Sequence, residues 1–296
     1  MNRFDMRRRL HFNFFDIMVY LVTFAFAVIC FYPLWYVFIV SIMEQDTYVR
    51  SGFILLPPPN PTFEYYKYIL ASKYFANAFL ISVAKTSLAT AGTIFITSAM
   101  AYAVSKDFLK GMKTLNFLMI FTMFFSGGLI PTFILYKSLN LLGSFWVMVI
   151  PSLTPASIFV IMRNYFSYSV PKELEDSCKI DGASDFVVFF KIVMPLSKSM
   201  IAAMSLFVAV SHWNDFTTFL YYVDKLALQP FIWLLRRMLI DPNLATSSVA
   251  AELDNFVPPL SLKMTTIICT MLPIMLVYPV LQKHFAKGIL IGAVKG

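Results

Sequence analysis

The sequence predicts an all-α membrane protein with six transmembrane helices, and its composition and its charge-free segments carry that prediction. Hydrophobic residues make up 59% of the 296 positions and charged residues only 14%, whereas a soluble domain has about 25% charged residues. The mean hydropathy is +0.72. A soluble core could not bury this much apolar surface, so we expect the chain to lie in a bilayer.

Six segments without Asp, Glu, Lys or Arg each supply most of a membrane-spanning helix. A hydrocarbon core about 30 Å thick requires roughly 20 residues of α-helix. No internal repeat or low-complexity tract is evident in the sequence, so we expect one membrane domain over 17–284. The helices expected within it are 17–43, 77–104, 114–136, 144–163, 199–220 and 263–283.

Basic residues indicate the orientation of these helices. Arg7, Arg8 and Arg9 come directly before the first helix, and more Lys and Arg lie in the connections that would share its side of the membrane. Because basic residues beside membrane helices favour the cytoplasmic side, both termini are expected in the cytoplasm. The cytoplasmic parts would then be an N-terminal arm over 1–16, a loop over 164–198 and a C-terminal tail over 285–296.

The formal net charge of +8 could suggest nucleic-acid binding, but the basic excess lies in short segments beside the predicted helices. Membrane topology and attraction to anionic lipid headgroups account for it, so we expect membrane lipid and no nucleic acid as a partner. Cys30, Cys178 and Cys269 lack the spacing of a disulfide framework or a metal site. The sequence therefore predicts neither a disulfide nor a bound metal.

The stretch 171–196, PKELEDSCKIDGASDFVVFFKIVMPL, is a charged island between the fourth and fifth predicted helices. Pro171 suits the first turn of a helix, because it has a fixed φ and no N–H to leave unpaired. Acidic residues follow at the positive end of the helix dipole, and Gly182 can end the helix with a positive φ. A second amphipathic stretch comes next. The sequence therefore predicts a short helix–turn–helix outside the bilayer that another protein can contact.

The order of residues in this loop resembles the "EAA" coupling loop of ABC importer permeases, on which a separate ATPase subunit docks. Asp-Ser-Cys stands where that family usually has Glu-Ala-Ala, so charge and small size are kept while the shorter Asp changes the reach toward the ATPase. An ordinary interfacial loop would explain the amphipathic pattern but not the whole order. The residues that carry the resemblance are Asp176, Ser177, Cys178, Lys179, Ile180, Asp181, Gly182, Ala183, Ile192, Pro195 and Leu196.

Motifs elsewhere are similar to those of maltose-type permeases, especially the subgroup that serves complex oligosaccharides. They are NAF from Asn77, GGLIP from Gly127, WND from Trp213, and the tail LQKHFAKGILIGAVKG. The resemblance implies the fold of a type I ABC importer permease in the bacterial cytoplasmic membrane. It also implies a second homologous permease subunit, two ATPase subunits that hold ATP and Mg²⁺, and an extracytoplasmic solute-binding protein.

The resemblance further assigns roles to parts of the chain. The stretch 243–259 would contact the binding protein. The glycine-punctuated tail, which is not expected to form a stable isolated helix, would reach into the ATPase dimer or, alternatively, adsorb to lipid. The ATPase-coupling residues would be Glu173, Glu175, Asp176, Ser177, Cys178, Lys179, Asp181, Gly182, Ala183, Pro195 and Lys295.

The sequence contains none of the common nucleotide-binding or hydrolytic motifs. Without a GxxxxGK[ST] loop the chain cannot cradle nucleotide phosphates by itself, and HExxH and GxSxG are also missing. We therefore expect a transport subunit rather than an enzyme, with no catalytic residue and no cofactor of its own. ATP hydrolysis would belong to another polypeptide.

Helix-breaking and polar residues inside the predicted helices mark a candidate substrate pathway. Breaks in membrane helices tend to face protein or an aqueous cavity, although a simple packing kink is an equal alternative. Lys85 is expected to snorkel toward the near end of its helix rather than to face a cavity. The candidate pathway residues are Gly127, Gly128, Pro131, Pro155, Trp213, Asn214 and Asp215.

The predicted function is ATP-driven, binding-protein-dependent import of an oligosaccharide. The external segments carry slightly more basic than acidic residues, which points weakly to an acidic, polysaccharide-derived sugar. Two other classes are alternatives. A proton-coupled secondary transporter would need a carboxylate relay in the membrane, for which Asp215 is the only candidate. An integral membrane transferase would need a cluster of nucleophilic or metal-binding residues, which the sequence lacks.

Overall fold

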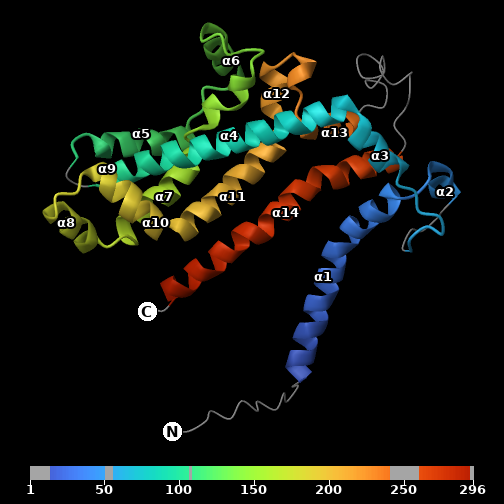
Figure 1. Cartoon of the computed structure of the whole chain (residues 1–296), viewed down its shortest axis with the longest axis horizontal. Coiled ribbons are helices and arrows are strands. Elements are labelled where there is room, and N and C mark those ends of the chain that lie inside the picture. The colour runs from blue at the N-terminus through green and yellow to red at the C-terminus, as the bar shows by residue number, and fades with distance from the viewer. Residues whose placement is uncertain (1–13, 51–55, 107–108, 241–259, 294–296) are drawn as a thin grey trace. The chain divides into compact units, whose positions relative to one another are not determined.

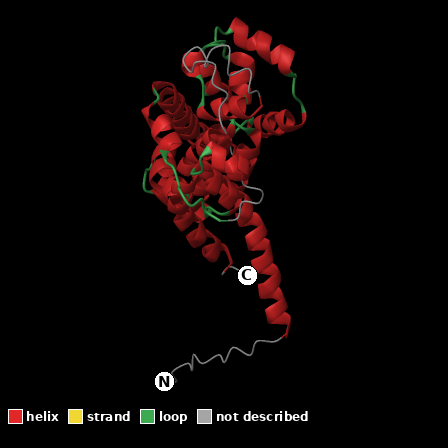
Figure 2. Cartoon of the chain, turned by 90° about the vertical axis from the view of Figure 1, so that its right-hand side faces the viewer, coloured by secondary structure: helices red, strands yellow, loops and turns green. Residues whose placement is uncertain are grey.

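A computed structural model describes residues 14–50, 56–106, 109–240 and 260–293. The regular secondary structure among these residues is entirely helical, with no strand (Figure 2). The helices and helical turns are α1 (Phe14–Ser41), α2 (Gln45–Arg50), α3 (Glu64–Ala71), α4 (Lys73–Val104), α5 (Met112–Phe124), α6 (Leu129–Ser138), η1 (Phe145–Met148), η2 (Ile150–Ser152), α7 (Ala156–Tyr168), α8 (Lys172–Ile180), α9 (Asp185–Val188), the π-helical turn η3 (Phe189–Val193), α10 (Met194–Leu196), α11 (Lys198–Asn214), α12 (Thr217–Tyr222), η4 (Leu226–Leu228), α13 (Phe231–Ile240) and α14 (Leu260–Ala293).

The chain divides into two compact units. The first consists of Met1–Tyr68 and Pro258–Ile268, and the second of Ile69–Val257 and Cys269–Gly296. The first unit therefore contains α1, α2 and the beginning of α14. The second contains α4 to α13 and the remainder of α14, and with them the loop at 171–196.

In the first unit, α1 is packed at its C-terminal end. Ile39, Val40 and Met43 form an apolar cluster there with residues at the start of α14. The Thr265 hydroxyl donates a hydrogen bond of 3.1 Å to the backbone carbonyl of Ser41. The most apolar part of α1 has a mean hydropathy of 2.3, and none of it is buried within the described chain. Such a surface is typical of a helix that faces lipid or another subunit.

In the second unit, α4 is the central helix and contacts α5, α7, α11 and α13 (Figure 1). Gly92 permits a close approach of the segment before α7, because a Cβ atom at Gly92 would lie 2.6 Å from Cδ2 of Leu153. The hydroxyls of Thr93 and Thr97 donate to the backbone carbonyls of Ser152 (3.1 Å) and Leu153 (3.0 Å). These bonds satisfy carbonyls beside the interrupted helix, as a membrane interior requires.

The main apolar core lies where the C-terminal part of α4 meets α7, η3 and α11. The ring of Tyr102 lies with its centroid 5.1 Å from that of Phe189 and 5.9 Å from that of Phe166. Phe159 and Met162 of α7 are fully buried in the same cluster. The loop at 171–196 therefore shares a core with the apolar helices and is not a separate module.

Four helical stretches of the described chain are long and apolar enough to cross a membrane. They are α1, α4, Phe145–Tyr168 and Leu260–Pro279. A fifth is present if Asp185–Leu196 and Lys198–Asn214, which meet at 80°, count as one broken span. The all-helical class is confirmed, whereas the count of six spans is not confirmed by the described residues.

Three of the expected helices are interrupted in the structure. The helix expected at 114–136 is divided into α5 and α6, which residues 125–128 separate. The one expected at 144–163 begins as η1 and η2, because Pro151 and Pro155 lack the N–H of a continuing helix. The one expected at 199–220 ends at Asn214 and resumes as α12 at Thr217. The tail, by contrast, continues α14 as far as Ala293.

Candidate functional site

The helix–turn–helix predicted at 171–196 is present. α8 begins directly after Pro171 and carries acidic residues in its first turn. Gly182 follows its end with φ +82°, and the N–H of Ala183 donates to the carbonyl of Cys178 at 2.9 Å. A residue without Cβ takes this left-handed conformation at little cost, which is the role the sequence predicts for Gly182.

The second half of the loop is anchored in the apolar core. The Ser184 hydroxyl accepts a bond of 3.4 Å from the N–H of Val187 at the start of α9. Val188, Phe189 and Val193 are buried against α4 and α7 residues. This half continues through an 80° bend into α11, so the loop and that helix are adjacent in the chain.

α8 itself exposes most of the predicted coupling residues. Cys178 and Ala183 are half-buried, and Lys295 lies outside the described residues. Ile180, a large apolar side chain at the end of α8, is 87% exposed. An exposed surface that combines carboxylates with an apolar side chain suits the docking of a protein partner. The exposed coupling residues are Glu173, Asp176, Ser177, Lys179, Asp181, Gly182 and Pro195.

Glu175 differs from its neighbours on α8, because it is only 5% exposed. Its Oε2 atom accepts hydrogen bonds from the Lys106 ammonium group and from the Tyr102 hydroxyl, the latter at 3.1 Å. The sequence pattern groups Glu175 with the exposed carboxylates and assigns no role to Tyr102 or Lys106. Their separation of 69 to 73 residues from Glu175 leaves no local signal for this contact.

The WND motif lies where α11 gives way to α12. The indole N–H of Trp213 donates to the backbone carbonyl of Thr270 in α14 at 3.0 Å. Oδ1 of Asp215 accepts bonds from the Thr217 hydroxyl (2.9 Å) and the Thr218 N–H (3.2 Å). Asp215 therefore caps α12 and satisfies donors that the helix break leaves open.

The side chain of Lys85 in α4 reaches the break between α11 and α12, and it is only 1% exposed. Its Nζ atom lies 2.6 Å from the backbone carbonyl oxygen of Asp215 and 3.0 Å from Oδ2 of the same residue. The snorkelling expected of Lys85 is therefore wrong. The interrupted α11 presents a carbonyl and a carboxylate inside the protein, and an ionised side chain in a membrane needs such partners.

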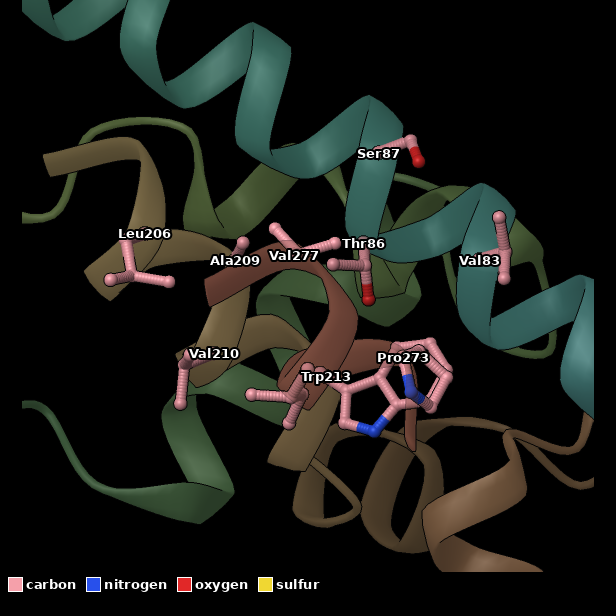
Figure 3. Close-up of a pocket in the computed structure, with 10 residues that line it drawn as sticks. Val83, Thr86, Ser87, Leu206, Ala209, Val210, Trp213, Pro273 and Val277 are labelled. Carbon is pink, nitrogen blue, oxygen red and sulfur yellow. The ribbon is translucent and has the colours of Figure 1, made fainter. Parts of the chain in front are cut away.

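A cavity of about 160 Å³ lies between α4, α11 and α14 (Figure 3). Trp213 lines it together with Ser87 and with Thr86, whose hydroxyl oxygen is buried and has no hydrogen-bond partner among the described residues. A mostly apolar cavity with a few polar groups is typical of small-molecule sites. The apolar lining residues are Val83, Leu206, Ala209, Val210, Pro273, Ile274 and Val277.

The other predicted pathway residues do not line this cavity in the described part of the chain. Gly127 and Gly128 lie in the turn between α5 and α6, where Gly128 has φ +87°. Pro131 lies in the first turn of α6, and Pro155 directly precedes α7. Asn214 is exposed. The structure thus brings Trp213 to a cavity and leaves the rest of the predicted pathway set dispersed.

A second hollow, of about 360 Å³, lies between α6 and the segment after α12. Phe133 and Tyr222 line it with stacked rings whose centroids are 6.3 Å apart. Asp224 and Lys225 supply a carboxylate and an ammonium group beside the rings. Aromatic faces next to charged groups suit a ligand with apolar and polar faces. The sequence offers no signal for this hollow, because no spacing along the chain links α6 to α12.

Comparison with known proteins gives consistent matches over most of the chain. Residues 114–291 match the family model described as binding-protein-dependent transport system inner membrane component. The polygalacturonan/rhamnogalacturonan transport system permease protein YtcP of Bacillus subtilis (strain 168) is 40% identical over 284 residues, which cover 95% of this chain and 98% of that protein. Protein LplC of the same strain is 42% identical over 254 residues, which cover 86% and 85%.

One solved structure is also similar along nearly the full length. It is the crystal structure of a bacterial ABC transporter involved in the import of the acidic polysaccharide alginate. The match has a TM-score of 0.82 and 28% sequence identity, and it covers 96% of this chain and 100% of that chain.

Proposed function

The chain belongs to the family of binding-protein-dependent transport system inner membrane components, and from this membership we propose that it carries acidic, polysaccharide-derived oligosaccharides into the cell. It is a multi-pass permease component of an ABC importer, and separate ATPase subunits hydrolyse the ATP. The predictions of family, of an all-helical permease fold and of a membrane location are confirmed.

The substrate class rests on the named relatives. One is a permease for polygalacturonan and rhamnogalacturonan, and the similar structure belongs to an importer of alginate. Galacturonan and alginate chains carry a carboxylate on their uronate units, so an anionic oligosaccharide is the chemistry that both share. The second hollow, with Lys225 beside the rings of Phe133 and Tyr222, can supply an ammonium group and aromatic faces to such a ligand.

The single observation that best supports coupling to an ATPase is the exposure of α8. Glu173, Asp176 and Ile180 are exposed, while the second half of the same loop packs into the core with residues of α4 and α7. ATPase subunits that close on ATP would push α8, and the bend into α11 would carry this movement to the membrane helices. Alternating access then follows from two arrangements of the membrane helices.

The complete importer contains further subunits. A second, homologous permease would pair with this chain, two ATPase subunits would bind ATP with Mg²⁺, and a solute-binding protein would deliver the substrate. Among the described residues, no group of three or more His, Cys, Asp or Glu side chains is placed to hold a metal ion. The predicted contact of 243–259 with the binding protein and the predicted contact of Lys295 with the ATPases lie outside the described residues.

The assembly can be tested by co-expressing the chain with a second permease and the ATPase, then reconstituting it in vesicles with the binding protein. We expect ATP-dependent uptake of a galacturonate trimer, and weaker uptake of a neutral galactose trimer. Asp176→Lys should weaken ATPase co-purification by charge reversal at an exposed α8 carboxylate, and Asp176→Asn is the matched control without reversal. Uptake driven by a proton gradient without ATP would favour a secondary transporter instead.

A further inference from the structure

One residue of α8, Glu175, makes its contacts inside the chain rather than at the surface. Among the described side chains of this helix, Glu175 is buried at 5% exposure, Cys178 is half-buried and the rest are exposed. An exposed carboxylate can meet a partner protein, but a buried one already has its partners inside the chain. The role of Glu175 therefore depends on Lys106 and Tyr102 of the segment that ends α4.

The three side chains form a compact cluster. Lys106 and Tyr102 both donate to Oε2 of Glu175, and the Lys106 Nζ atom lies 4.3 Å from the centroid of the Tyr102 ring. The second carboxylate oxygen, Oε1, is buried without a hydrogen-bond partner among the described residues. A buried carboxylate held on one oxygen alone depends strongly on its cation, because charge-assisted bonds are stronger than neutral ones.

Tyr102 connects this cluster to the rest of the core. Its ring packs against Phe166 of α7 and Phe189 of η3, and its hydroxyl binds Glu175 of α8. Four helical segments therefore meet at one side chain. Without Glu175, the contacts left between α8 or its flanking residues and this core would be those of Val170, Cys178 and Ala183.

We propose that Glu175 is a positioning residue that fastens α8 to the cytoplasmic end of α4, so that displacement of α8 by the ATPase moves α4 as well as α11. The inference rests on the proposed docking of ATPase subunits on the exposed face of α8. Glu175 acts through Lys106 and Tyr102 and makes no contact with the ATPase. Thr86 of α4 lines the cavity together with Trp213 of α11. A contact between α8 and α4 therefore links the loop to this cavity by a second route, besides the route through α11.

The test measures substrate transported per ATP hydrolysed in the reconstituted assembly, with a galacturonate trimer as the probe. Glu175→Lys and Lys106→Glu should each bind the ATPase subunits as the unchanged chain does and still hydrolyse ATP. Each should lower transport per ATP at least about tenfold, equivalent to about 1.4 kcal/mol. The double variant with exchanged charges should recover most of this loss, which a residue with a merely structural role would not show.

Two milder variants keep the proposal testable where charge reversal prevents folding. Tyr102→Phe removes one hydroxyl donor, and Glu175→Gln removes the charge while the shape stays the same; both should lower transport per ATP by about threefold or more. The matched control is a charge reversal at Lys110, an exposed lysine four residues after Lys106 that is outside the predicted coupling residues. Lys110→Glu should change the ratio less than twofold.

The outcomes separate this inference from the proposed function. Unchanged transport per ATP in Glu175→Gln and Tyr102→Phe would overturn the inference while the importer assignment stands. Loss of ATPase binding in Glu175→Gln, with no loss in Tyr102→Phe, would also overturn it, because Glu175 would then contact the ATPase directly. If the unchanged chain neither binds an ATPase nor consumes ATP, the proposed function fails instead.

Discussion

Two lysine–carboxylate pairs hold α4, and they differ in how completely their polar atoms are satisfied. The ammonium of Lys85 has two acceptors on Asp215, whose other carboxylate oxygen caps α12. The ammonium of Lys106 meets Oε2 of Glu175, whose Oε1 has no partner among the described residues. The two lysines are 21 residues apart in the chain, and a helix of that length spans about 31 Å, close to the thickness of a hydrocarbon core.

The difference separates a structural pair from one that can take part in a conformational change. The Lys85 side chain is 1% exposed and its partner belongs to a helix break, so removing either group leaves an unpaired charge in the protein interior. The Lys106 and Glu175 side chains are 14% and 6% exposed, and Glu175 belongs to a helix whose other side is open. The first pair fixes α11 and α12 to α4, whereas the second can move with α8.

The largest effect is expected for Lys85→Met. This change leaves the Asp215 carboxylate and carbonyl without their cation, and the free energy of unfolding should fall by about 3–5 kcal/mol. Thermal unfolding of the purified protein in detergent measures the loss. Lys85→Met combined with Asp215→Asn should be less destabilised than Lys85→Met alone, because Asn keeps an acceptor oxygen for α12. If Lys85→Met alone unfolds at the same temperature as the unchanged protein, the Lys85–Asp215 pair is not the more important of the two pairs for stability.

A smaller loss is expected for Lys106→Met. It removes one charge-assisted hydrogen bond from a site near the end of α4, so the free energy of unfolding should fall by about 1.5–3 kcal/mol. The same detergent measurement applies, with Tyr102→Phe as the comparison that removes a neutral donor to the same oxygen. A loss as large as that of Lys85→Met would show that both pairs are purely structural.

Gly182→Ala tests whether α8 must end where it does. The backbone has φ +82° there, and a Cβ atom would meet no described atom within 4 Å, so the cost comes from the backbone alone. We expect a loss of about 1 kcal/mol in stability, and a lower ratio of transport to ATP hydrolysis. Gly182→Asn is the control, since Asn tolerates this conformation better than Ala. Equal behaviour of Ala and Asn would show that the turn tolerates strain.

The smallest effect is expected for Lys179→Gln. Lys179 and Asp185 are 36% and 65% exposed, and ion pairs of this kind contribute about 0–1 kcal/mol in water. The unfolding midpoint should therefore stay within the error of measurement, at low and at high salt. A salt-dependent loss would indicate that this pair, and not only Glu175, holds the loop in place.

Features that depend on neighbouring residues follow from the sequence alone. Charge-free segments identify the apolar helices because burial in lipid needs about 20 consecutive apolar residues. Pro171 and Gly182 set the two ends of α8 because each restricts or permits a backbone conformation at its own position. The helix–turn–helix and the permease family are therefore predictable from the order of residues.

Features that depend on distant partners come only from the tertiary structure. Lys85 meets Asp215 across 130 residues and Lys106 meets Glu175 across 69, so no local spacing distinguishes a buried carboxylate from exposed Asp176 beside it. The sequence shows that Pro151 and Pro155 interrupt the helix. It does not show that the hydroxyls of Thr93 and Thr97 bind the backbone carbonyls that the interruption leaves free. Local sequence sets the backbone choices, whereas burial and charge pairing depend on which surfaces the fold brings together.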